Sequence, residues 1–370
     1  MYAQPRGWIG STVVIAGSLV LAVLSVWAGV SHWLLLILLA TAAAGLLVTW
    51  PRGDEPEGSS AQFHPLDCEG ACGVERSPNS SAVATPRSGL DSPVLVLGAT
   101  GLVGHFLVDR LHAAGVDVVG LSRQARAPTP GLTWIAGDLE SPGLVLPSPL
   151  PVAISISNIW LLGPALPALY AAGVKRLVAF SSTSRFTKLA SPVAHEREIA
   201  QTLARAEEEI QAFCEVHGIA WTILRPTIIY AEGRDRSITR IAALIRRFGV
   251  LPVYGNGSGM RQPVHADDLA AGAIAAAAMP ATKNRAYNLP GGDTLTFRRM
   301  CERIFEGLGR RPRIVSVPPA LWKVTFAVGG RFVPGVTSAM GSRMTDDLVF
   351  DARPAQSDFQ WNPRGFQPRF

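Results

Sequence analysis

The sequence predicts an α/β fold: a doubly wound parallel sheet with helices on both faces, a smaller lobe after it and two transmembrane helices before it. Three observations predict this arrangement. From Pro93 onward, short apolar runs alternate with amphipathic helical segments, which is typical of a parallel sheet buried on both faces. A glycine-rich turn follows the first apolar run, and the residues before position 51 are almost entirely apolar.

The N-terminal segment is long enough to cross a membrane twice. Residues 7–50 contain no Asp, Glu, Lys or Arg, and about 20 apolar residues in a helix span a bilayer core of ~30 Å. We expect one helix near Trp8–Ala28 and a second near Trp33–Thr49, with the lipid bilayer as their partner. A cleaved signal peptide would account for the first helix and leave the second unexplained.

Charges at the ends of this pair predict its orientation. Arg6 and Arg52 flank the two helices, and the turn between them carries no Lys or Arg. Because positive charge stays on the cytoplasmic side, we expect a two-pass protein of the inner or cytoplasmic membrane with its main domain in the cytoplasm. Residues 51–92 are rich in Pro, Ser and Gly and predict a flexible linker.

Two further classes of partner are not supported by the composition. His64, Cys68 and Cys72 have a spacing that matches no strong zinc pattern, so we predict no metal site. The net charge is +6, but no cluster of Lys and Arg interleaved with aromatic residues is present. We therefore expect no nucleic-acid partner.

The domain at 93–370 is read from its alternation of elements. Apolar runs predict the strands, and amphipathic segments that end at glycine predict the helices. A looser pattern after Tyr230 predicts a substrate-covering lobe, mostly within 231–370. The expected strands are 93–98, 116–123, 132–138, 151–157, 175–182, 219–226 and 313–317, and the expected helices are 104–115, 165–173, 198–218, 237–249, 267–278 and 297–309.

The glycine-rich turn predicts a dinucleotide site. A turn between a strand and a helix directs backbone N–H groups and the positive end of the helix at a pyrophosphate. Gly98 permits the tight turn, Gly101 lets the backbone approach the ligand, and Gly104 lets the helix pack on the strand. The residues expected to hold the phosphates are Gly98, Thr100, Gly101, Leu102, Val103 and Gly104.

The ends of the next two strands predict the cofactor's adenosine half. The second strand ends in Ser122 and Arg123 instead of an acidic residue. An arginine there suits a ribose 2′-phosphate, so NADP is favoured over NAD. Asp138 and Leu139 close the third strand, where a carboxylate can reach the adenine amine.

Six motifs make the chain from about Val94 resemble a known family. They are GATGLVG at 98–104, GD at 137–138, AAGVKRLVAFSS at 171–182, LRPTIIYAEGRD at 224–235, PVHADDLAAG at 263–272 and NRAYNLPGGDTLTF at 284–297. The domain resembles the extended short-chain dehydrogenase/reductases, the NAD-dependent epimerase/dehydratase family. The resemblance implies a Rossmann domain, a nicotinamide cofactor that also meets Ser157, Ser181 and Pro226, and often a nucleotide-sugar substrate.

The same resemblance implies a catalytic centre that this chain lacks in part. In the family, a Ser or Thr after the fifth strand acts with Tyr-x-x-x-Lys on the next helix. Thr183 matches the hydroxyl, and Arg205 followed by Glu209 fits the register of Lys and a following Glu, which puts Gln201 in the place of Tyr. Glutamine cannot exchange a proton in this pH range, and arginine is effectively never deprotonated.

Three interpretations therefore stay open. Chemistry persists with another proton carrier, for which His195, Lys188 and Tyr230 are candidates; or the chain binds NADP(H) as a non-catalytic subunit of a membrane assembly; or it has lost cofactor binding as well. The family positions Tyr230, Arg234, Arg261 and His265 are expected to line the substrate cleft, with the two arginines on a diphosphate. The leading expectation is an oxidoreductase or epimerase acting on a nucleotide sugar or a lipid-linked substrate, and the non-catalytic subunit is the alternative.

Overall fold

The structure is a computed structural model that describes residues 89–322 and 343–370. The predicted transmembrane pair at 7–50, nearly all of the predicted linker, and Cys68 and Cys72 lie outside these residues. Within the described part of the chain, no helix combines the length and the apolar composition needed to cross a membrane. Nor does that part bring together three His, Cys, Asp or Glu side chains suited to a metal ion.

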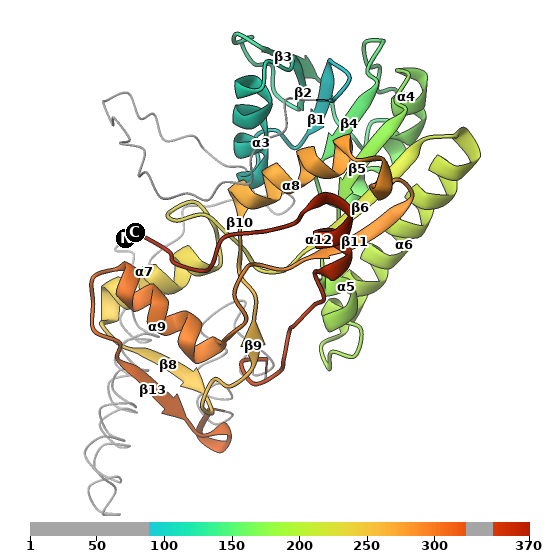
Figure 1. Cartoon of the computed structure of the whole chain (residues 1–370). Coiled ribbons are helices and arrows are strands. Elements are labelled where there is room, and N and C mark those ends of the chain that lie inside the picture. Colours follow the sequence, from blue (N-terminus) through green and yellow to red (C-terminus); the bar gives the residue numbers. More distant parts are fainter. Residues whose placement is uncertain (1–88, 323–342) are drawn as a thin grey trace, which may run out of the picture. The chain divides into compact units, whose positions relative to one another are not determined.

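A seven-stranded parallel sheet forms the centre of the described structure (Figure 1). Its strand order is β11-β6-β5-β4-β1-β2-β3, so the chain starts beside the middle, builds one edge and then returns to build the other. Open sheets of this kind bind ligands at that reversal, outside the carboxyl ends of the strands. The strands are β1 (Val94–Leu97), β2 (Val118–Ser122), β3 (Leu132–Ala136), β4 (Val152–Ser155), β5 (Arg176–Phe180), β6 (Ala220–Pro226) and β11 (Arg285–Leu289).

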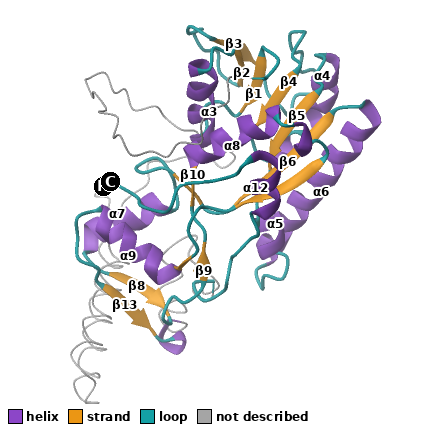
Figure 2. Cartoon of the chain, in the orientation of Figure 1, coloured by secondary structure: helices purple, strands orange, loops and turns teal. Residues whose placement is uncertain are grey.

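Helices pack on both faces of this sheet (Figure 2), as the sequence predicts. One buried cluster joins the sheet to α3 and α8 through side chains such as Leu107 and Leu269. The other joins it to α4 and α6 through Leu166 and Ile210. The helices of this layer are α3 (Leu102–Ala113), α4 (Leu166–Ala171), α5 (Ser184–Thr187), α6 (Ala194–His217), α8 (Ala266–Ala278) and α12 (Arg353–Phe359), with 3₁₀ turns at Ile159–Leu161, Gly163–Ala165 and Pro280–Thr282.

Part of the segment predicted as a separate lobe belongs to the sheet layer. β11 adds a seventh strand beside β6, and α12 contacts it through an edge-to-face pair of Tyr287 and Phe359, with ring centroids 5.2 Å apart. The alanine-rich α8 is buried along almost its whole length. Its Gly272 lies so close to Trp361 that a Cβ there would come within 2.5 Å of the indole ring. Residues 231–370 therefore complete the sheet layer as well as forming the lobe.

The smaller lobe has its own buried core and short strands. Its core includes Tyr230, Ile245, Phe305 and Phe366. In the lobe β7 pairs with β10, β9 with β12 and β8 with β13. Its elements are β7 (Ile229–Tyr230), α7 (Ile238–Phe248), β8 (Leu251–Tyr254), β9 (Met260–Arg261), β10 (Val264–His265), β12 (Leu295–Thr296), α9 (Phe297–Gly307) and β13 (Ile314–Val317).

Candidate functional site

The glycine turn between β1 and α3 has the geometry of an anion cradle. Gly98 has φ +85°, and a Cβ there would lie 2.9 Å from the Ser157 backbone nitrogen. A Cβ on Gly104 would overlap the Gly98 carbonyl oxygen. Gly101 is the N-cap of α3 and provides no side-chain cap, and Thr100 and Gly101 are exposed. The first N–H groups of α3 are therefore open to a ligand, and a pyrophosphate fits there.

The remaining predicted residues of the turn pack α3 against the hydrophobic core. Val103 is buried in the cluster beneath α3, and Leu102 packs against the same cluster. The turn is closed by a backbone hydrogen bond of 2.9 Å, in which the Gly101 N–H donates to the Gly98 carbonyl oxygen. The loop therefore has a fixed shape before any ligand arrives.

The end of β2 presents two arginines and no acidic side chain. Ser122 Oγ accepts hydrogen bonds from the Gln124 N–H and from Arg126 Nε, each at 3.2 Å. The Arg126 guanidinium lies 5.2 Å from the centre of the Trp134 ring, which helps to orient it. Arg123, three residues earlier in the chain, is exposed. Sequence reasoning named Ser122 and Arg123 but missed Arg126, which the S-R-x-x-R spacing already indicates.

At the end of β3 the predicted residues have structural roles. Asp138 Oδ1 accepts a hydrogen bond of 3.1 Å from the Glu140 N–H, which fixes the turn there. Leu139 is buried in the core beneath the sheet. The Asp138 carboxylate keeps its second oxygen for a further donor.

A buried carboxylate organises the carboxyl ends of β5 and β6. Glu207 of α6 has a fully buried side chain and accepts a hydrogen bond of 2.5 Å from Ser181 Oγ. It also forms ion pairs of 2.5 Å with Arg185 of α5 and Arg225 of β6. Because two cations and a hydroxyl surround one carboxylate, this network fixes α5 and α6 against the sheet edge. We call Ser181, Arg185, Glu207 and Arg225 the Glu207 cluster.

Gln201 and Arg205 do not join this cluster. Both are exposed on α6, and the Arg205 guanidinium donates a hydrogen bond of 3.5 Å to the Thr202 hydroxyl. The face of α6 that packs on the sheet carries Ala200, Leu203, Ala206 and Glu207 instead. Helix α6 therefore exposes Gln201 and Arg205 instead of packing them against the sheet.

The three alternative proton carriers have different surroundings. The His195 side chain is 77% exposed and faces Glu198. Burial, together with the charge of Arg343, lowers the pKa of Lys188 from its ordinary value. Tyr230 is 1% exposed within the lobe core, and its burial raises the pKa of its phenol above the ordinary value. A phenol in that state is a poor proton donor or acceptor near neutral pH.

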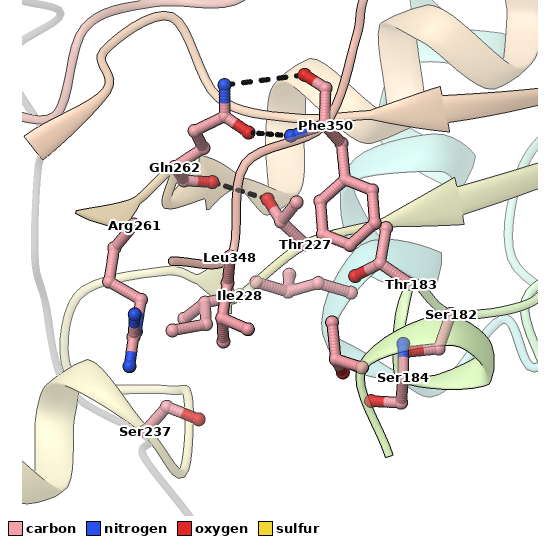
Figure 3. Close-up of a pocket in the computed structure, with 12 residues that line it drawn as sticks. Ser182, Thr183, Ser184, Thr227, Ile228, Ser237, Arg261, Gln262, Leu348 and Phe350 are labelled. Atoms are coloured by element: carbon pink, nitrogen blue, oxygen red, sulfur yellow. Dashed lines mark hydrogen bonds between the residues drawn. The ribbon is translucent and has the colours of Figure 1, made fainter. Parts of the chain in front are cut away.

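A pocket of about 350 Å³ opens beside Thr183 (Figure 3). Thr183 itself is 6% exposed, and its hydroxyl donates to the Pro226 carbonyl oxygen at 3.1 Å. The Gln262 amide holds the Phe350 backbone, accepting from its N–H at 2.8 Å. Hydroxyl groups and apolar side chains share the wall. The lining residues are Ser182, Thr183, Ser184, Thr187, Thr227, Ile228, Ile229, Ser237, Arg261, Gln262, Leu348 and Phe350.

Of the four predicted substrate residues, only Arg261 lines this pocket. It is 4% exposed and donates to three backbone carbonyl oxygens, those of Met260, Arg343 and Asp346. Tyr230 lies instead in the lobe core. The Arg234 guanidinium stacks 5.3 Å from the Phe106 ring of α3, outside the pocket wall.

His265, the fourth predicted substrate residue, supports a helix. Its Nδ1 accepts a hydrogen bond of 3.1 Å from the Asp267 N–H and so caps α8. Its Nε2 lies 3.2 Å from Glu232. Burial alone would raise the pKa of Glu232, but the hydrogen bond and charge of His265 are among the contacts that outweigh it and lower that pKa. The pair ties β10 to the loop after β7.

Comparisons with solved structures confirm the fold. A dTDP-glucose 4,6-dehydratase from Streptomyces venezuelae with NAD bound superposes with a TM-score of 0.54 at 18% identity, over 74% of this chain and 92% of that chain. MoeE5 in complex with UDP-glucuronic acid and NAD superposes with a TM-score of 0.56 at 21% identity, over 74% of this chain and 95% of that one. At these identities the likeness shows the fold alone.

The curated proteins that are similar to this chain in sequence have names that describe different functions. A protein of Arabidopsis thaliana, NADH dehydrogenase [ubiquinone] 1 alpha subcomplex subunit 9, is 27% identical over 60% of this chain, and the match spans 60% of that protein's own length. A 3-diazoavenalumate denitrifying reductase of Streptomyces is 28% identical over 51% of this chain and 73% of its own length. The 2-alkyl-3-oxoalkanoate reductase of Shewanella oneidensis is 22% identical over 73% of this chain and 82% of its own length.

The family model covers the regions that build the site. It matches residues 94–146 and 157–289, together just over half of the chain, and these ranges contain the glycine turn, the Glu207 cluster and most of the pocket wall. With the strand order and the capless glycine turn, this match places the chain in the NAD dependent epimerase/dehydratase family.

Proposed function

We propose that the chain binds NADP(H) at the glycine turn and uses it as an oxidoreductase or epimerase on a substrate held in the pocket beside Thr183. The observation that carries the proposal is the exposed, capless N-terminus of α3 at Gly101, at the same sheet edge as the ends of β5 and β6. A bound nicotinamide supplies or accepts a hydride there. The protein's part is to hold and orient both molecules.

The end of β2 supports NADP over NAD. Arg126 is oriented by Ser122 and Trp134, and Arg123, which follows Ser122 directly, is exposed. Two guanidinium groups suit a dianionic 2′-phosphate, which each can hold through paired N–H donors. No carboxylate stands at this strand end to accept hydrogen bonds from a free 2′-hydroxyl.

The Glu207 cluster suggests a different register for the family's catalytic pair. If Glu207 is the glutamate four residues after the family's Lys, the Lys position becomes Leu203 and the Tyr position becomes Ile199. Leu203 is 4% exposed and packs in the core. Neither register contains a phenol or an ammonium group, so a proton for the substrate oxygen must come from water or from another hydroxyl. The Thr183 oxygen can accept a hydrogen bond because its own proton is directed to Pro226.

The pocket favours a lipid-linked or acyl substrate over a nucleotide sugar. The predicted diphosphate grip needs Arg234 and Arg261 together, but Arg234 is stacked on α3 and Arg261 already donates to three carbonyl oxygens. The Shewanella relative is named for an alkyl-oxoalkanoate substrate. The apolar residues 7–50 support attachment to a bilayer, with the site on the cytoplasmic side.

A second function is favoured by the missing proton donor. An NADP(H)-binding subunit without turnover, within a membrane assembly, needs the glycine turn but no phenol. Two relatives, from Arabidopsis thaliana and Dictyostelium discoideum, are named as subunits of NADH dehydrogenase. The two functions share the cofactor and differ in whether hydride leaves it.

One experiment tests both. The full-length chain, reconstituted in lipid nanodiscs, is titrated with NADPH and NADH and then incubated with candidate carbonyl and sugar-nucleotide substrates while nicotinamide absorbance is followed. Saturable NADPH binding with turnover that falls in Thr183→Val supports the enzyme. Saturable binding without turnover on any substrate supports the subunit, and no saturable binding of either nucleotide contradicts both.

A further inference from the structure

An exposed phenyl ring next to the pocket-lining Phe350 lies against two arginines. Phe186 of α5 is 46% exposed. The guanidinium carbon of Arg225 lies 5.2 Å from the centre of its ring, and that of Arg185 lies 5.9 Å from it. Both arginines are fixed by ion pairs to the fully buried Glu207. The ring is therefore oriented by cation–π contacts while it remains in contact with solvent.

A second ring lies next to Phe186. The rings of Phe186 and Phe350 have centroids 6.3 Å apart, and Phe350 lines the pocket. We call Phe186 and Phe350 the apolar rim. Phe350 shares the pocket wall with the apolar side chains of Ile228, Ile229 and Leu348.

The pocket is too small to enclose a long ligand completely. A volume of about 350 Å³ is at the low end of the ~300–1,000 Å³ usual for ligand sites. A ligand whose polar group reaches the hydroxyl-lined interior beside Thr183 must place any long substituent across the mouth. The surface it meets there is apolar and preorganised, because Phe186 is already oriented before binding.

We propose that the apolar rim binds the alkyl chain of an amphiphilic substrate, whose carbonyl-bearing head enters the pocket between Thr183 and Arg261. This assignment rests on the proposed function and names the substrate class of the same site. The hydroxyl groups of Ser182, Ser184 and Thr187 line this pocket and can donate hydrogen bonds to the oxygen atoms of the polar head. Burial of each methylene against the rim strengthens binding about fourfold until the rim is covered.

The test uses a photoreactive probe and the full-length chain in nanodiscs. The probe is a long-chain 3-oxo acid that carries a diazirine in its alkyl chain, and cross-linked peptides are mapped by mass spectrometry. We expect saturable labelling of the peptides at 182–189 and 343–350, in competition with unlabelled long-chain 3-oxo acid and not with its short-chain analogue. NADPH affinity is measured in parallel on the same samples, so that loss of the cofactor site is seen separately.

Two matched variants complete the design. Phe186→Ser weakens competition by the long-chain acid about tenfold, and Phe186→Leu largely restores it. The control is Phe248→Ser, because Phe248 is also exposed, at 40%, and also carries an arginine over its ring, at 5.6 Å. The inference is overturned if NADPH binds but the rim peptides are unlabelled, if chain length has no effect, or if Phe186→Ser behaves like Phe248→Ser. Absence of NADPH binding overturns the proposed function instead.

Discussion

Under the proposed function, single side chains at the end of β2 set the preference for NADP over NAD. The SRQAR stretch places Ser122 and Arg126 four residues apart, and in the structure the serine hydroxyl accepts from the Arg126 guanidinium. That guanidinium is therefore already directed before a phosphate arrives. A ribose without the phosphate gains nothing from it.

Replacing this arginine should separate the two nucleotides. We expect Arg126→Ala to raise the Kd for NADPH about 10- to 100-fold, because a charge-assisted pair to phosphate is lost, and to leave the Kd for NADH within about twofold. Fluorescence titration of the full-length chain measures both. Arg240→Ala, an exposed arginine of α7, is the control and should bind as the unmodified chain does. An equal loss for both nucleotides would contradict the assignment.

Helix α6 shows where sequence reasoning fails at this scale. The glycine turn was predictable because its residues are adjacent in sequence and each has a local steric reason. The register of α6 was not predictable, because two glutamates can serve as the one that follows the family's Lys by four residues. Glu209 follows Arg205 at this spacing, and Glu207 follows Leu203. Only the non-local ion pairs with Arg185 and Arg225 show which glutamate faces inward.

The exposure of Gln201 and Arg205 on α6 predicts how a variant that rebuilds the family motif will behave. Gln201→Tyr with Arg205→Lys rebuilds the family motif in sequence, but both side chains point to solvent. We expect the double variant to keep its NADPH affinity and its turnover within about twofold of the unmodified chain. A large gain in turnover, measured by nicotinamide absorbance, would show that positions 201 and 205 do correspond to the family's Tyr and Lys.

At the scale of elements, one carboxylate joins two helices and the C-terminal segment. Asp267 in the first turn of α8 pairs with Arg110 of α3 at 2.6 Å and with Arg364 at 2.6 Å. Burial acts to raise the pKa of Asp267, but the hydrogen bonds and charges of Arg110 and Arg364 outweigh it and hold that pKa below its ordinary value. The helix that carries the glycine turn is thereby fixed to α8.

The lowered pKa predicts an acid-dependent loss of stability. Asp267 makes its full contribution to the free energy of unfolding above its unfolded pKa of about 3.9. This contribution is lost as pH falls through the lower pKa of the folded state. Asp267→Asn should reduce the free energy of unfolding by about 1–3 kcal/mol at neutral pH, and the difference should shrink below about pH 4. Urea unfolding at several pH values measures it. A difference that is constant with pH would exclude this role.

Helices and strands were predicted correctly where the apolar pattern extends over many residues, and they were missed where the segment is short. The six early strands and the long helices were predicted because their apolar runs span several residues. β7, β9, β10 and β12 have only two residues each, which is too few to show an alternation. β11 reads RAYNL, a polar stretch that becomes a strand because β6 offers it an open edge.

At the scale of the whole molecule, the C-terminal residues connect the sheet layer to the lobe. Phe359 and Trp361 lie in the core beneath α8, and Phe366 lies in the lobe core. Arg303 donates to the Phe366 carbonyl oxygen at 2.9 Å. We infer that the two cores unfold together, because one short segment contributes to both.

Two buried thiols report on this cooperation. Cys214 lies in the core below the sheet and Cys301 in the lobe core, and burial raises the pKa of each to about 12. At pH 8 roughly one in ten thousand of these groups is a thiolate, so both resist alkylation in the folded chain. Both should become reactive at the same urea concentration, as followed by mass spectrometry of the labelled peptides. Reactivity of Cys301 at a clearly lower concentration would show that the lobe unfolds alone.

The most direct measurement of the account is a titration of the full-length chain with NADPH, compared with Gly101→Val and Gly143→Ala. The Gly101 N-cap is exposed with an ordinary extended backbone, and a Cβ there would lie 3.1 Å from the Gly98 carbonyl oxygen. Valine at this position therefore covers the helix N-terminus and makes one tight contact with the turn. A Cβ on Gly143 meets nothing within 4 Å. We predict saturable binding to the unmodified chain and to Gly143→Ala, and affinity at least about tenfold weaker in Gly101→Val. Binding that Gly101→Val leaves unchanged, or no saturable binding at all, would contradict a dinucleotide held at this turn.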